Sequence, residues 1–357
     1  MSETQQADVR SRSPHRYRSV RRGLLALTIV VLPVAGVATT AEARPTIGQV
    51  QQRIDALEHD AERAAERYNA TKERLAGLKV RITAAQVRVD RSSGQVDAAK
   101  RELGRLGAET YKAGEFSGLS LFLSDDPDAV LAQSGVAETL GERRLAAIER
   151  LQAHQRQLKA DAADVAAQRR KLDEALAALE ADKRLVQAKL SAAKAELSRL
   201  TAKQRAALQR ASRAAAERSL SEAVGKKVSP GASCDDVGIS ASSGRVQKVL
   251  DYACAQLGDP YRWGADGPDS FDCSGLTQRA WAQAGVSLPH NAEMQARYGR
   301  RVKAADLQPG DLVFYHSPIS HVGIYVGNKL MLHAPRTGEV VKIAAVRYGD
   351  LVAAVRL

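Results

Sequence analysis

Aromatic residues and cysteines are both scarce in this sequence. Its 357 residues include 4% Phe, Trp and Tyr and only three cysteines. No CxxC or HExxH spacing is present, so the usual signatures of a zinc site are missing. Zinc stays a minor alternative because thiol and imidazole ligands suit it, and four histidines lie close together in the last third: His290, His316, His321 and His333. We expect neither a metal nor a cofactor.

A long apolar run is also missing. The stretch "GLLALTIVVLPVAGVA" has about 16 residues and contains Pro33, which is short against the roughly 20 that span a bilayer as a helix. Arginines precede this run, and small residues flank a cleavage point in "AEA" at 41 to 43. We therefore predict a signal peptide over 1–43 and a secreted, cell-wall or extracytoplasmic location, with a membrane anchor as the alternative. The "RRGLL" stretch leaves the Sec and twin-arginine routes both open.

Acidic residues are fewer than basic ones, and the net charge is +12. An exported basic chain meets anionic cell wall or lipid headgroups rather than nucleic acid, so we expect no nucleic-acid partner. Ala, Arg, Lys, Glu, Gln and Leu crowd the first two thirds, whereas Gly, Pro, Tyr and Trp gather in the last third. This division predicts a repetitive helical segment followed by a compact domain.

Apolar or small residues recur in 4-3 steps over two long segments, which predicts a coiled coil. One seam runs from Val50 to Leu106 and the other from Ile148 to Leu200. Glycines and a proline in "KAGEFSGLSLFLSDDPDAV" separate them, so we expect an antiparallel hairpin over 44–222. The apolar "LSLFL" tip either closes the hairpin or docks a partner. Polar residues interrupt the second seam 14 apart, as if they specified its register: Gln155, Arg169 and Lys183.

Residues 223–244 are rich in Ser, Gly and Pro, which predicts a flexible linker. The remaining residues, 245–357, are enough for one small domain. Helical patterns in "RVQKVLDYACAQLG" and "DCSGLTQRAWAQAG" come first, and five short β-rich runs follow: "DLVFYH", "HVGIYVG", "LMLHA", "VVKI" and "LVAAVRL". Helices followed by strands predict an α+β domain with an antiparallel sheet.

Cys273 lies at the start of the second of these helices, between Asp272 and Ser274. A cysteine of ordinary pKa is mostly protonated at neutral pH, and a helix N-terminus or a nearby imidazolium lowers that pKa. A small buried side chain is the alternative role, but it fits poorly between two polar residues. We predict that Cys273 is a nucleophile.

Two histidines are candidates for its base. His321 opens the strand "HVGIYVG", and His333 follows a turn that contains Gly327 and Asn328. A three-residue turn would place His333 opposite Gly323 and both imidazoles on one face, within side-chain reach. A two-residue turn would break this parity. One imidazole can then act as base while the other orients it.

The segment 245–357 resembles the NlpC/P60 cysteine peptidases, a papain-like family. The resemblance rests on "YRWGADGPDSFDCSGLTQRAW", "LP" at 288 and 289, "LQPGDLVFY", and "HVGIYVG" followed by "HA". It implies that Cys273 is the nucleophile, His321 the base and His333 the third member of the triad. It also implies an oxyanion donor, Tyr261, and a substrate cleft lined by Asp272, Ser274 and Trp263. His290 stands where the family commonly has Arg, which leaves that contact open.

The family implies acyl transfer on peptidoglycan stem peptides, as a DL-endopeptidase that cuts the bond between D-γ-glutamate and diaminopimelate. The hairpin is similar in layout to those of Rip-type and PcsB-type wall hydrolases, which implies regulation by an FtsEX-like membrane complex during cell division. The hairpin either covers the Cys273 cleft until a partner engages it or acts only as a spacer. A catalytically silent adaptor that binds cell wall or activates another hydrolase is the alternative function.

Cys234 and Cys254 are the two remaining cysteines, and an exported chain permits a disulfide between them. The alternative is two unpaired thiols, one in the linker and one on a helix. In either case Cys273 has no partner left and should stay reduced.

Overall fold

The computed structural model describes residues 46–112, 127–241 and 243–357. The predicted signal peptide over 1–43 and the "LSLFL" tip at 119–123 lie outside these ranges. Among the described helices, none combines the length and the apolar character needed to cross a bilayer.

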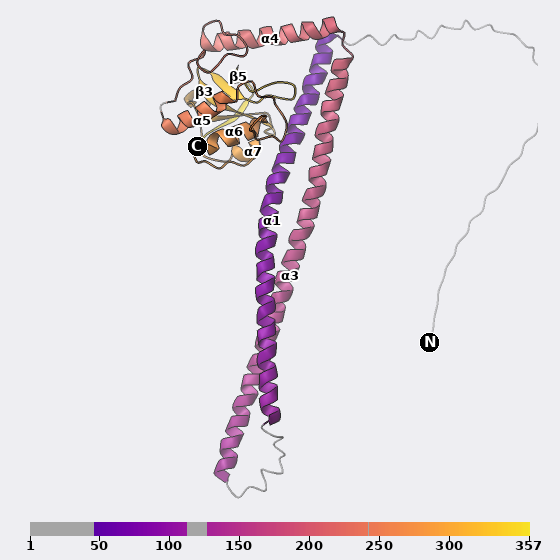
Figure 1. Cartoon of the computed structure of the whole chain (residues 1–357), viewed down its shortest axis with the longest axis vertical. Coiled ribbons are helices and arrows are strands. Elements are labelled where there is room, and N and C mark those ends of the chain that lie inside the picture. Colours follow the sequence, from indigo (N-terminus) through magenta and orange to yellow (C-terminus); the bar gives the residue numbers. More distant parts are fainter. Residues whose placement is uncertain (1–45, 113–126, 242) are drawn as a thin grey trace, which may run out of the picture. The chain divides into compact units, whose positions relative to one another are not determined.

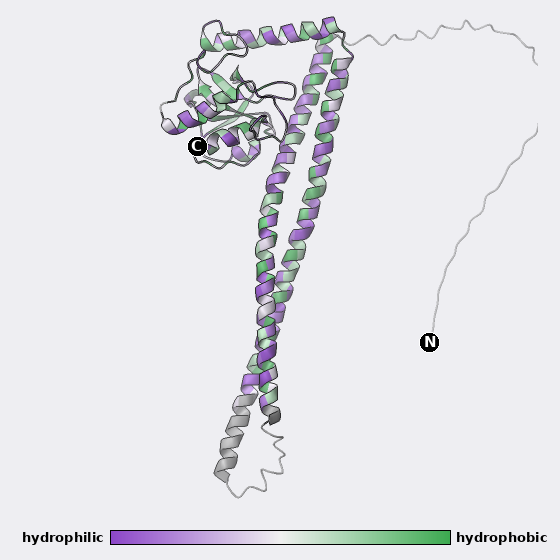
Figure 2. Ribbon diagram, viewed as in Figure 1, coloured by the Kyte–Doolittle hydropathy of each residue, from purple (hydrophilic) through white to green (hydrophobic). Residues whose placement is uncertain are grey.

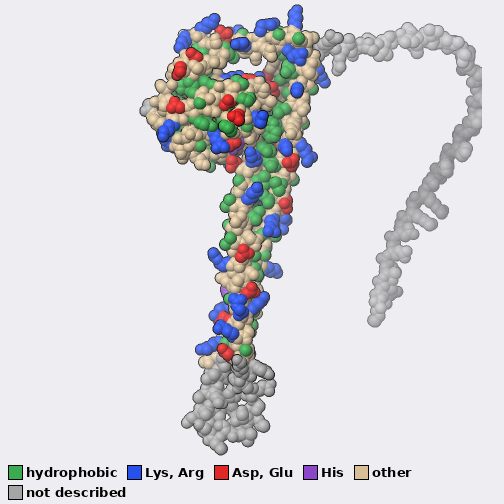
Figure 3. Space-filling model, viewed as in Figure 1, with side chains coloured by type: hydrophobic (Ala, Val, Ile, Leu, Met, Phe, Trp, Pro, Cys, Tyr) green, Lys and Arg blue, Asp and Glu red, His purple; other side chains and the backbone are tan. Residues whose placement is uncertain are grey.

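Two long helices form the hairpin (Figure 1). Helix α1 covers Ile47–Lys112 and α3 covers Pro127–Ser198, which corresponds to about 100 and 108 Å of helix at 1.5 Å per residue. Cross-helix ion pairs join Arg67 to Asp182 and Arg150 to Glu102. Arg67, early in α1, pairs with a residue late in α3, and Glu102, late in α1, pairs with a residue earlier in α3. The two helices are therefore antiparallel, as predicted. Charges of both signs are interspersed along the hairpin surface (Figure 3).

The polar residues of the seam are not those that the 14-residue spacing predicts. Gln155 and Arg169 are exposed, and the Lys183 side chain is 44% exposed. The buried polar contact instead joins Ser92 Oγ to Asp161 Oδ2 at 2.5 Å. On an undistorted helix, residues seven apart differ in direction by about 20°, so residues 14 apart differ by about 40°. Residues at this spacing therefore do not all stay on the face that contacts the other helix.

Helix α3 ends at Ser198, and a separate helix, α4 (Ala202–Val224), follows it. The hairpin therefore ends before the predicted 222. Thr201 caps α4 by accepting a hydrogen bond from the Gln204 N–H, while the Gln204 side chain accepts one from the Thr201 N–H. This capping box satisfies two helix-end donors and starts a new helix directly after Leu200, the last residue of the predicted seam.

The segment after α4 is packed rather than flexible. Val228 is 5% exposed and Val237 is 3% exposed, and both join the core of the C-terminal domain. Cys234 and Cys254 form a disulfide, which attaches this segment to helix α5 (Gly244–Ala255). The prediction of a flexible linker over 223–244 is therefore wrong, because two valines and a covalent bond hold the segment on the domain. We call residues 226–237 the strap.

The C-terminal domain has the predicted α+β architecture with an antiparallel sheet. Its sheet order is β1-β6-β2-β3-β4-β5. Helix α6 covers Cys273–Ala282 and α7 covers Ala292–Gln295, and a short 3-10 helix covers Ala304–Asp306. The strands are β1 (Arg300–Arg301), β2 (Leu312–Tyr315), β3 (His321–Gly327), β4 (Leu330–His333), β5 (Lys342–Ala345) and β6 (Leu351–Arg356).

Two apolar clusters cover the two faces of the sheet. The larger one packs α5, α6 and the strap on one face, and includes Phe271, Trp281 and Phe314. The smaller one lies on the other face and includes Tyr315 and Met331. The strands of this domain are coloured mainly as hydrophobic, whereas its helices carry both colours (Figure 2).

The β3–β4 turn differs from the predicted three-residue turn. Asn328 and Lys329 alone separate the strands, and both have the positive φ of a two-residue hairpin turn, 52° and 59°. An irregularity between Tyr325 and Gly327 inserts one residue into β3. The pair Ile324–Leu332 therefore keeps the predicted register, because the bulge restores the parity that a two-residue turn removes.

We predict that the strap disulfide stabilises the C-terminal domain. Replacing both Cys234 and Cys254 by Ser opens a loop with a sequence separation of 20 and should lower the free energy of unfolding by about 3 kcal/mol. Denaturant unfolding followed by tryptophan fluorescence measures this change. A reducing agent should destabilise the unsubstituted chain by a similar amount and leave the double variant unaffected; equal sensitivity of the two chains would contradict the assignment.

Candidate active site

Cys273 is the first residue of α6, and its side chain is 3% exposed. Asp272 caps this helix by accepting a hydrogen bond from the Gly275 N–H at 2.7 Å. A Cβ on Gly275 would lie 2.3 Å from the Ala265 carbonyl oxygen, so only glycine lets the helix start so close to the preceding loop. The sulfur therefore lies at the positive end of a helix whose position is fixed by close backbone packing.

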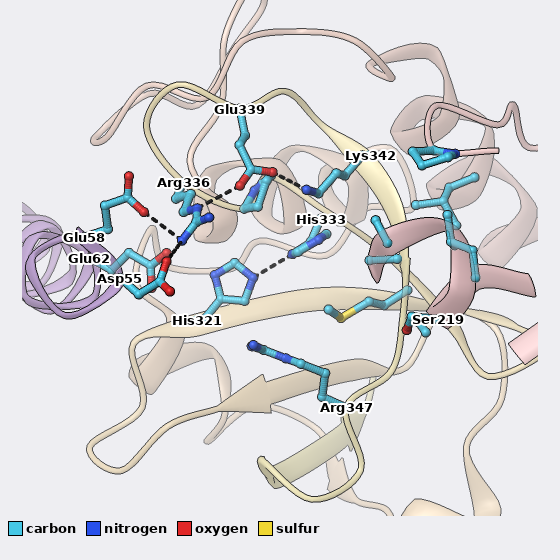
Figure 4. Close-up of a pocket in the computed structure, with 18 of the residues that line it drawn as sticks. Asp55, Glu58, Glu62, Ser219, His321, His333, Arg336, Glu339, Lys342 and Arg347 are labelled. Carbon is cyan, nitrogen blue, oxygen red and sulfur yellow. Dashed lines mark hydrogen bonds and ion pairs between the residues drawn. The ribbon is translucent and has the colours of Figure 1, made fainter. Parts of the chain in front are cut away.

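The two predicted histidines meet as expected. His321 Nε2 lies 2.8 Å from His333 Nδ1, and both rings are buried (Figure 4). Burial lowers the pKa of His321 well below its ordinary value, and His333 lowers it further. Burial also lowers the pKa of His333, to about 3. Among the described residues, His321 Nδ1 and His333 Nε2 have no hydrogen-bond partner, so each neutral imidazole keeps one nitrogen available.

Tyr261 and Trp263 line the same region from the loop before α6. Tyr261 is 8% exposed, and burial raises the pKa of its hydroxyl, with the negative charge of a Cys273 thiolate as the next cause. The hydroxyl therefore stays protonated close to the sulfur. Trp263 does not face open solvent, because its ring packs edge-on against Tyr68 of α1, with 5.1 Å between centroids.

The Asp272 side chain forms hydrogen bonds to several elements of the structure. Its carboxylate receives hydrogen bonds from the Gly264 N–H at 2.8 Å and from Asn69 Nδ2 of α1 at 2.9 Å. His290 Nε2 lies 2.8 Å from its other oxygen. Burial is the largest single effect on the pKa of Asp272 and raises it, but the His290 charge and the hydrogen bonds from His290, Asn69 and the Gly275 N–H together lower the net pKa. Burial likewise lowers the pKa of His290, but the charge and hydrogen bond of Asp272 together with the Glu66 charge raise the net pKa, so Asp272 and His290 form a buried ion pair.

This ion pair gives a role to His290, which stands where the NlpC/P60 family commonly has Arg. The protonated histidine supplies the positive charge that pairs with Asp272. In the part of the chain that the structure describes, the four histidines of the alternative zinc site do not gather into one group of ligands. His290 is committed to Asp272, His321 to His333, and His316 packs against His59 of α1 with ring centroids 4.2 Å apart.

Glu66 of α1 lies against the candidate nucleophile, a contact that the sequence analysis did not foresee. Its Oε1 accepts from Ser274 Oγ at 2.8 Å and lies 3.6 Å from the Cys273 thiol. Its Oε2 accepts from Asn291 Nδ2 at 2.8 Å and from the Ala292 N–H at 2.6 Å. The carboxylate is thus held by three groups of the domain beside the sulfur.

Comparisons with known proteins match this domain. The NlpC/P60 family model matches residues 258–352. These residues form an NlpC/P60 domain. A probable endopeptidase of Mycobacterium tuberculosis is 45% identical over 95 residues, 27% of this chain and 25% of that relative. A probable endopeptidase of Corynebacterium glutamicum is 42% identical over 117 residues, 33% of this chain and 55% of that relative. The chain therefore spans from a quarter to about half the length of these relatives.

A solved structure of the NlpC/p60 domain of the peptidoglycan hydrolase SagA is also similar. It is 32% identical and covers 31% of this chain and 98% of that chain, with a TM-score of 0.30.

Helix α1 meets the NlpC/P60 domain through carboxylates spaced three, four or seven residues apart. We call this set the acidic stripe: Asp55, Glu58, Glu62, Glu66 and Glu73. Glu73 accepts from the His290 N–H at 2.9 Å, and Asp55 and Glu58 pair with Arg336 at 3.0 and 2.7 Å. The sequence offered one indication of this contact surface: the spacing of these carboxylates places them along one side of the helix.

A cavity of about 630 Å³ separates α1 from the histidine pair. His321 and His333 line it on one side, and Glu58 and Glu62 of α1 project toward it on the other (Figure 4). Ser219 of α4 closes a third side. The described part of the hairpin and α4 thus cover the histidine side of the site without filling it.

We predict that Gly275→Ala destabilises the NlpC/P60 domain by about 1–3 kcal/mol, because the added Cβ must displace the backbone at Ala265. Gly244→Ala is the matched control, since Gly244 also opens a helix and nothing lies within 4 Å of its added Cβ. Denaturant unfolding of both variants measures the difference. Equal stability of the two variants would contradict the close approach at Gly275.

Proposed function

We propose that this chain is an exported cysteine endopeptidase that cleaves peptidoglycan stem peptides and is stored in a closed form by its own helix α1. The observation that carries the catalytic part is the hydrogen-bonded pair His321–His333 in an NlpC/P60 domain, together with the contact between the Cys273 thiol and the backbone of Val322, the residue after His321. The similar proteins named probable endopeptidases support the same activity.

The proposed reaction is acyl transfer with Cys273 as nucleophile. His321 Nδ1 takes the thiol proton, while Nε2–H of His321 donates to His333 Nδ1 and keeps the ring oriented. The thiolate attacks an amide carbonyl, and the Tyr261 hydroxyl and backbone N–H groups stabilise the oxyanion that develops. His321 then protonates the leaving amine, and water attacks the thioester and releases the enzyme. No cofactor is needed for these steps.

The closed form suppresses the first of these steps. Burial raises the pKa of Cys273 well above its ordinary value, and the charges of Glu66 and Asp272 raise it further. Burial meanwhile lowers the pKa of His321. In the closed form Cys273 therefore keeps its proton and His321 does not accept it. Since the thiolate is the nucleophile, this form is inactive. Removal of α1 would admit water and take away the Glu66 charge, and the N-terminus of α6 would then favour the thiolate.

Glu66 also suggests what the cleft recognises. Its carboxylate is bound by Ser274 Oγ, Asn291 Nδ2 and the Ala292 N–H. A D-glutamate that is linked through its γ-carboxyl keeps its α-carboxylate free next to the scissile bond. We infer that these three groups receive that carboxylate, which supports the D-γ-glutamyl-diaminopimelate bond as the one that is cut, and that Asp272 and Trp263 border the cleft.

Release of α1 requires a partner that engages the hairpin. An FtsEX-like membrane complex acting outside the cytoplasmic membrane during cell division is the proposed activator, because the hairpin is long enough to transmit a displacement and carries no catalytic group of its own. The spacer role is the competing proposal for the hairpin, and the contacts of Glu66 favour inhibition over it.

We predict that Cys273→Ala abolishes cleavage of stem peptides and that His321→Ala lowers the rate by about 100- to 10,000-fold, because the nucleophile and its base are removed. His333→Ala should keep weak activity, about 100-fold below the unsubstituted chain, since only the orientation of the base is lost. Product formation by liquid chromatography and circular dichroism of each variant measure activity and folding. If all three folded variants cleave at comparable rates, the domain is not a peptidase of this kind, and the adaptor function gains support.

We predict that Glu66→Ala raises the cleavage rate of the full chain by about 5- to 150-fold, the usual range for coupling between a regulatory contact and a site. Glu109→Ala is the matched control, because Glu109 is exposed on the same helix; it should leave the rate unchanged. An increase in both variants would indicate general loosening of the hairpin, and an increase in neither would leave only the spacer role.

The same contact predicts a pH dependence. Burial raises the pKa of Glu66 from 4.5 to about 7 in the closed form, with the Asp272 charge as the next cause. A carboxyl whose pKa is raised stabilises the closed form below about pH 4.5, and this contribution is lost as the pH rises through about 7. The rate of the unsubstituted chain divided by that of Glu66→Ala should therefore rise between pH 5 and 8. A ratio that stays constant with pH would show that the titration of Glu66 does not affect the stability of the closed form.

A further inference from the structure

A second cluster of polar side chains joins α1 to the NlpC/P60 domain beside the cavity. His59 and Glu62 lie one turn apart on α1, and His316 follows β2. One ligand atom from each of the three lies within 4.8 Å of the other two. His59 Nδ1 and Glu62 Oε2 are 3.9 Å apart, which is beyond an ordinary hydrogen bond.

The donor set is that of a transition metal rather than of magnesium or calcium. Two imidazoles and one carboxylate bind zinc at about 2.0–2.2 Å in many proteins, whereas magnesium and calcium prefer oxygen ligands. Tetrahedral zinc places its ligand atoms about 3.4 Å apart. His59, Glu62 and His316 reach that spacing by small side-chain movements, because their ligand atoms are already within 4.8 Å of one another.

The surroundings leave room for the remaining ligand. All three residues line the cavity of about 630 Å³, so a water molecule can reach the fourth position and the ion has a path of entry. Arg336 lines the same cavity, and it pairs with Asp55, Glu58 and Glu339. Arg347 and Lys342 also line the cavity, and Lys342 pairs with Glu339.

We propose that His59, Glu62 and His316 bind one zinc ion that clamps helix α1 onto the NlpC/P60 domain. The clamp rests on the proposed latency of the peptidase. Since two ligands come from the helix and one from the domain, the complete site exists only in the closed form. By linkage, an ion that binds only the closed form stabilises that form against release.

Binding is tested in the full chain carrying Cys273→Ala, which removes the thiol as a competing ligand. Calorimetric titration with zinc chloride should give one site, and cobalt(II) should give the visible absorption of a tetrahedral complex. His59→Ala and His316→Asn should each weaken zinc binding at least about tenfold. Asn is chosen at 316 because φ is 73° there and Asn tolerates that conformation. His154→Ala, on α3, is the matched control and should bind zinc normally.

Two results would overturn the site. Zinc binding that is equal in all these chains would place the ion elsewhere. Loss of binding in His321→Ala but not in His316→Asn would place it at the histidine pair. Because Cys273→Ala is used, neither result depends on peptidase activity, so the inference can fail while the proposed function stands.

The clamp itself is tested in chains with Cys273 intact. A chelator should raise the cleavage rate of the unsubstituted chain and leave the rate of His316→Asn unchanged, because that variant has no clamp to lose. An equal response of the two chains, or no response in either, would overturn the clamp. A chain that cleaves nothing under any condition, yet binds zinc through His59 and His316, would instead count against the proposed function.

Discussion

The rest of the site depends on the buried carboxylate of Asp272. It caps α6 and thereby fixes the first turn that carries Cys273. The same group holds the preceding loop through the Gly264 N–H, pairs with His290, and receives Asn69 from α1. A single acid thus connects helix α6, the loop before it, the loop after it and helix α1. A buried charge with this many partners has to be satisfied in full, since each lost partner leaves it poorly solvated.

Docking of α1 brings a second acid, Glu66, next to Asp272. Ser274 Oγ lies within hydrogen-bond distance of both, 2.8 Å from Glu66 and 3.3 Å from Asp272. Two carboxylates in one buried site repel each other, and this opposes the favourable contacts along the rest of the acidic stripe. The docked helix α1 is therefore held by hydrogen bonds and ion pairs but opposed by the repulsion between Glu66 and Asp272. Opposing contributions of this kind suit a contact that is stable and can still be released.

Much of the fold and of the catalytic set could be predicted from the sequence, because both depend on local patterns. The heptad seam predicted two antiparallel arms. Alternation along two strands predicted that His321 and His333 meet if the turn had three residues; they do meet, but through a two-residue turn and a bulge in β3 that the sequence did not reveal. The end of α3 was missed because the hairpin was extended past Leu200, where the seam stops, although Thr201 and Gln204 form a capping box there. The packed strap was missed because Ser- and Gly-rich composition does not reveal two valines and a disulfide that hold it.

The contacts of the acidic stripe were beyond prediction for a different reason. Glu66 and Cys273 are 207 residues apart in sequence, and nothing local to either one encodes their meeting. The stripe is visible as a spacing on α1, but solvent-exposed helices carry similar spacings without any partner. Only the placement of the domain on the helix brings these carboxylates against Cys273, Ser274 and Arg336.

The strap disulfide also sets a length. The chain leaves α4 at Val224 and is covalently joined to α5 at Cys234. If the strap separated from the core, the ten residue-to-residue steps from Val224 to Cys234 would extend to no more than about 35 Å. The disulfide therefore limits how far the parts can separate: the NlpC/P60 domain could move away from α1 but would stay within this distance of the end of α4. Any substrate of the domain would then have to lie within reach of the end of α4.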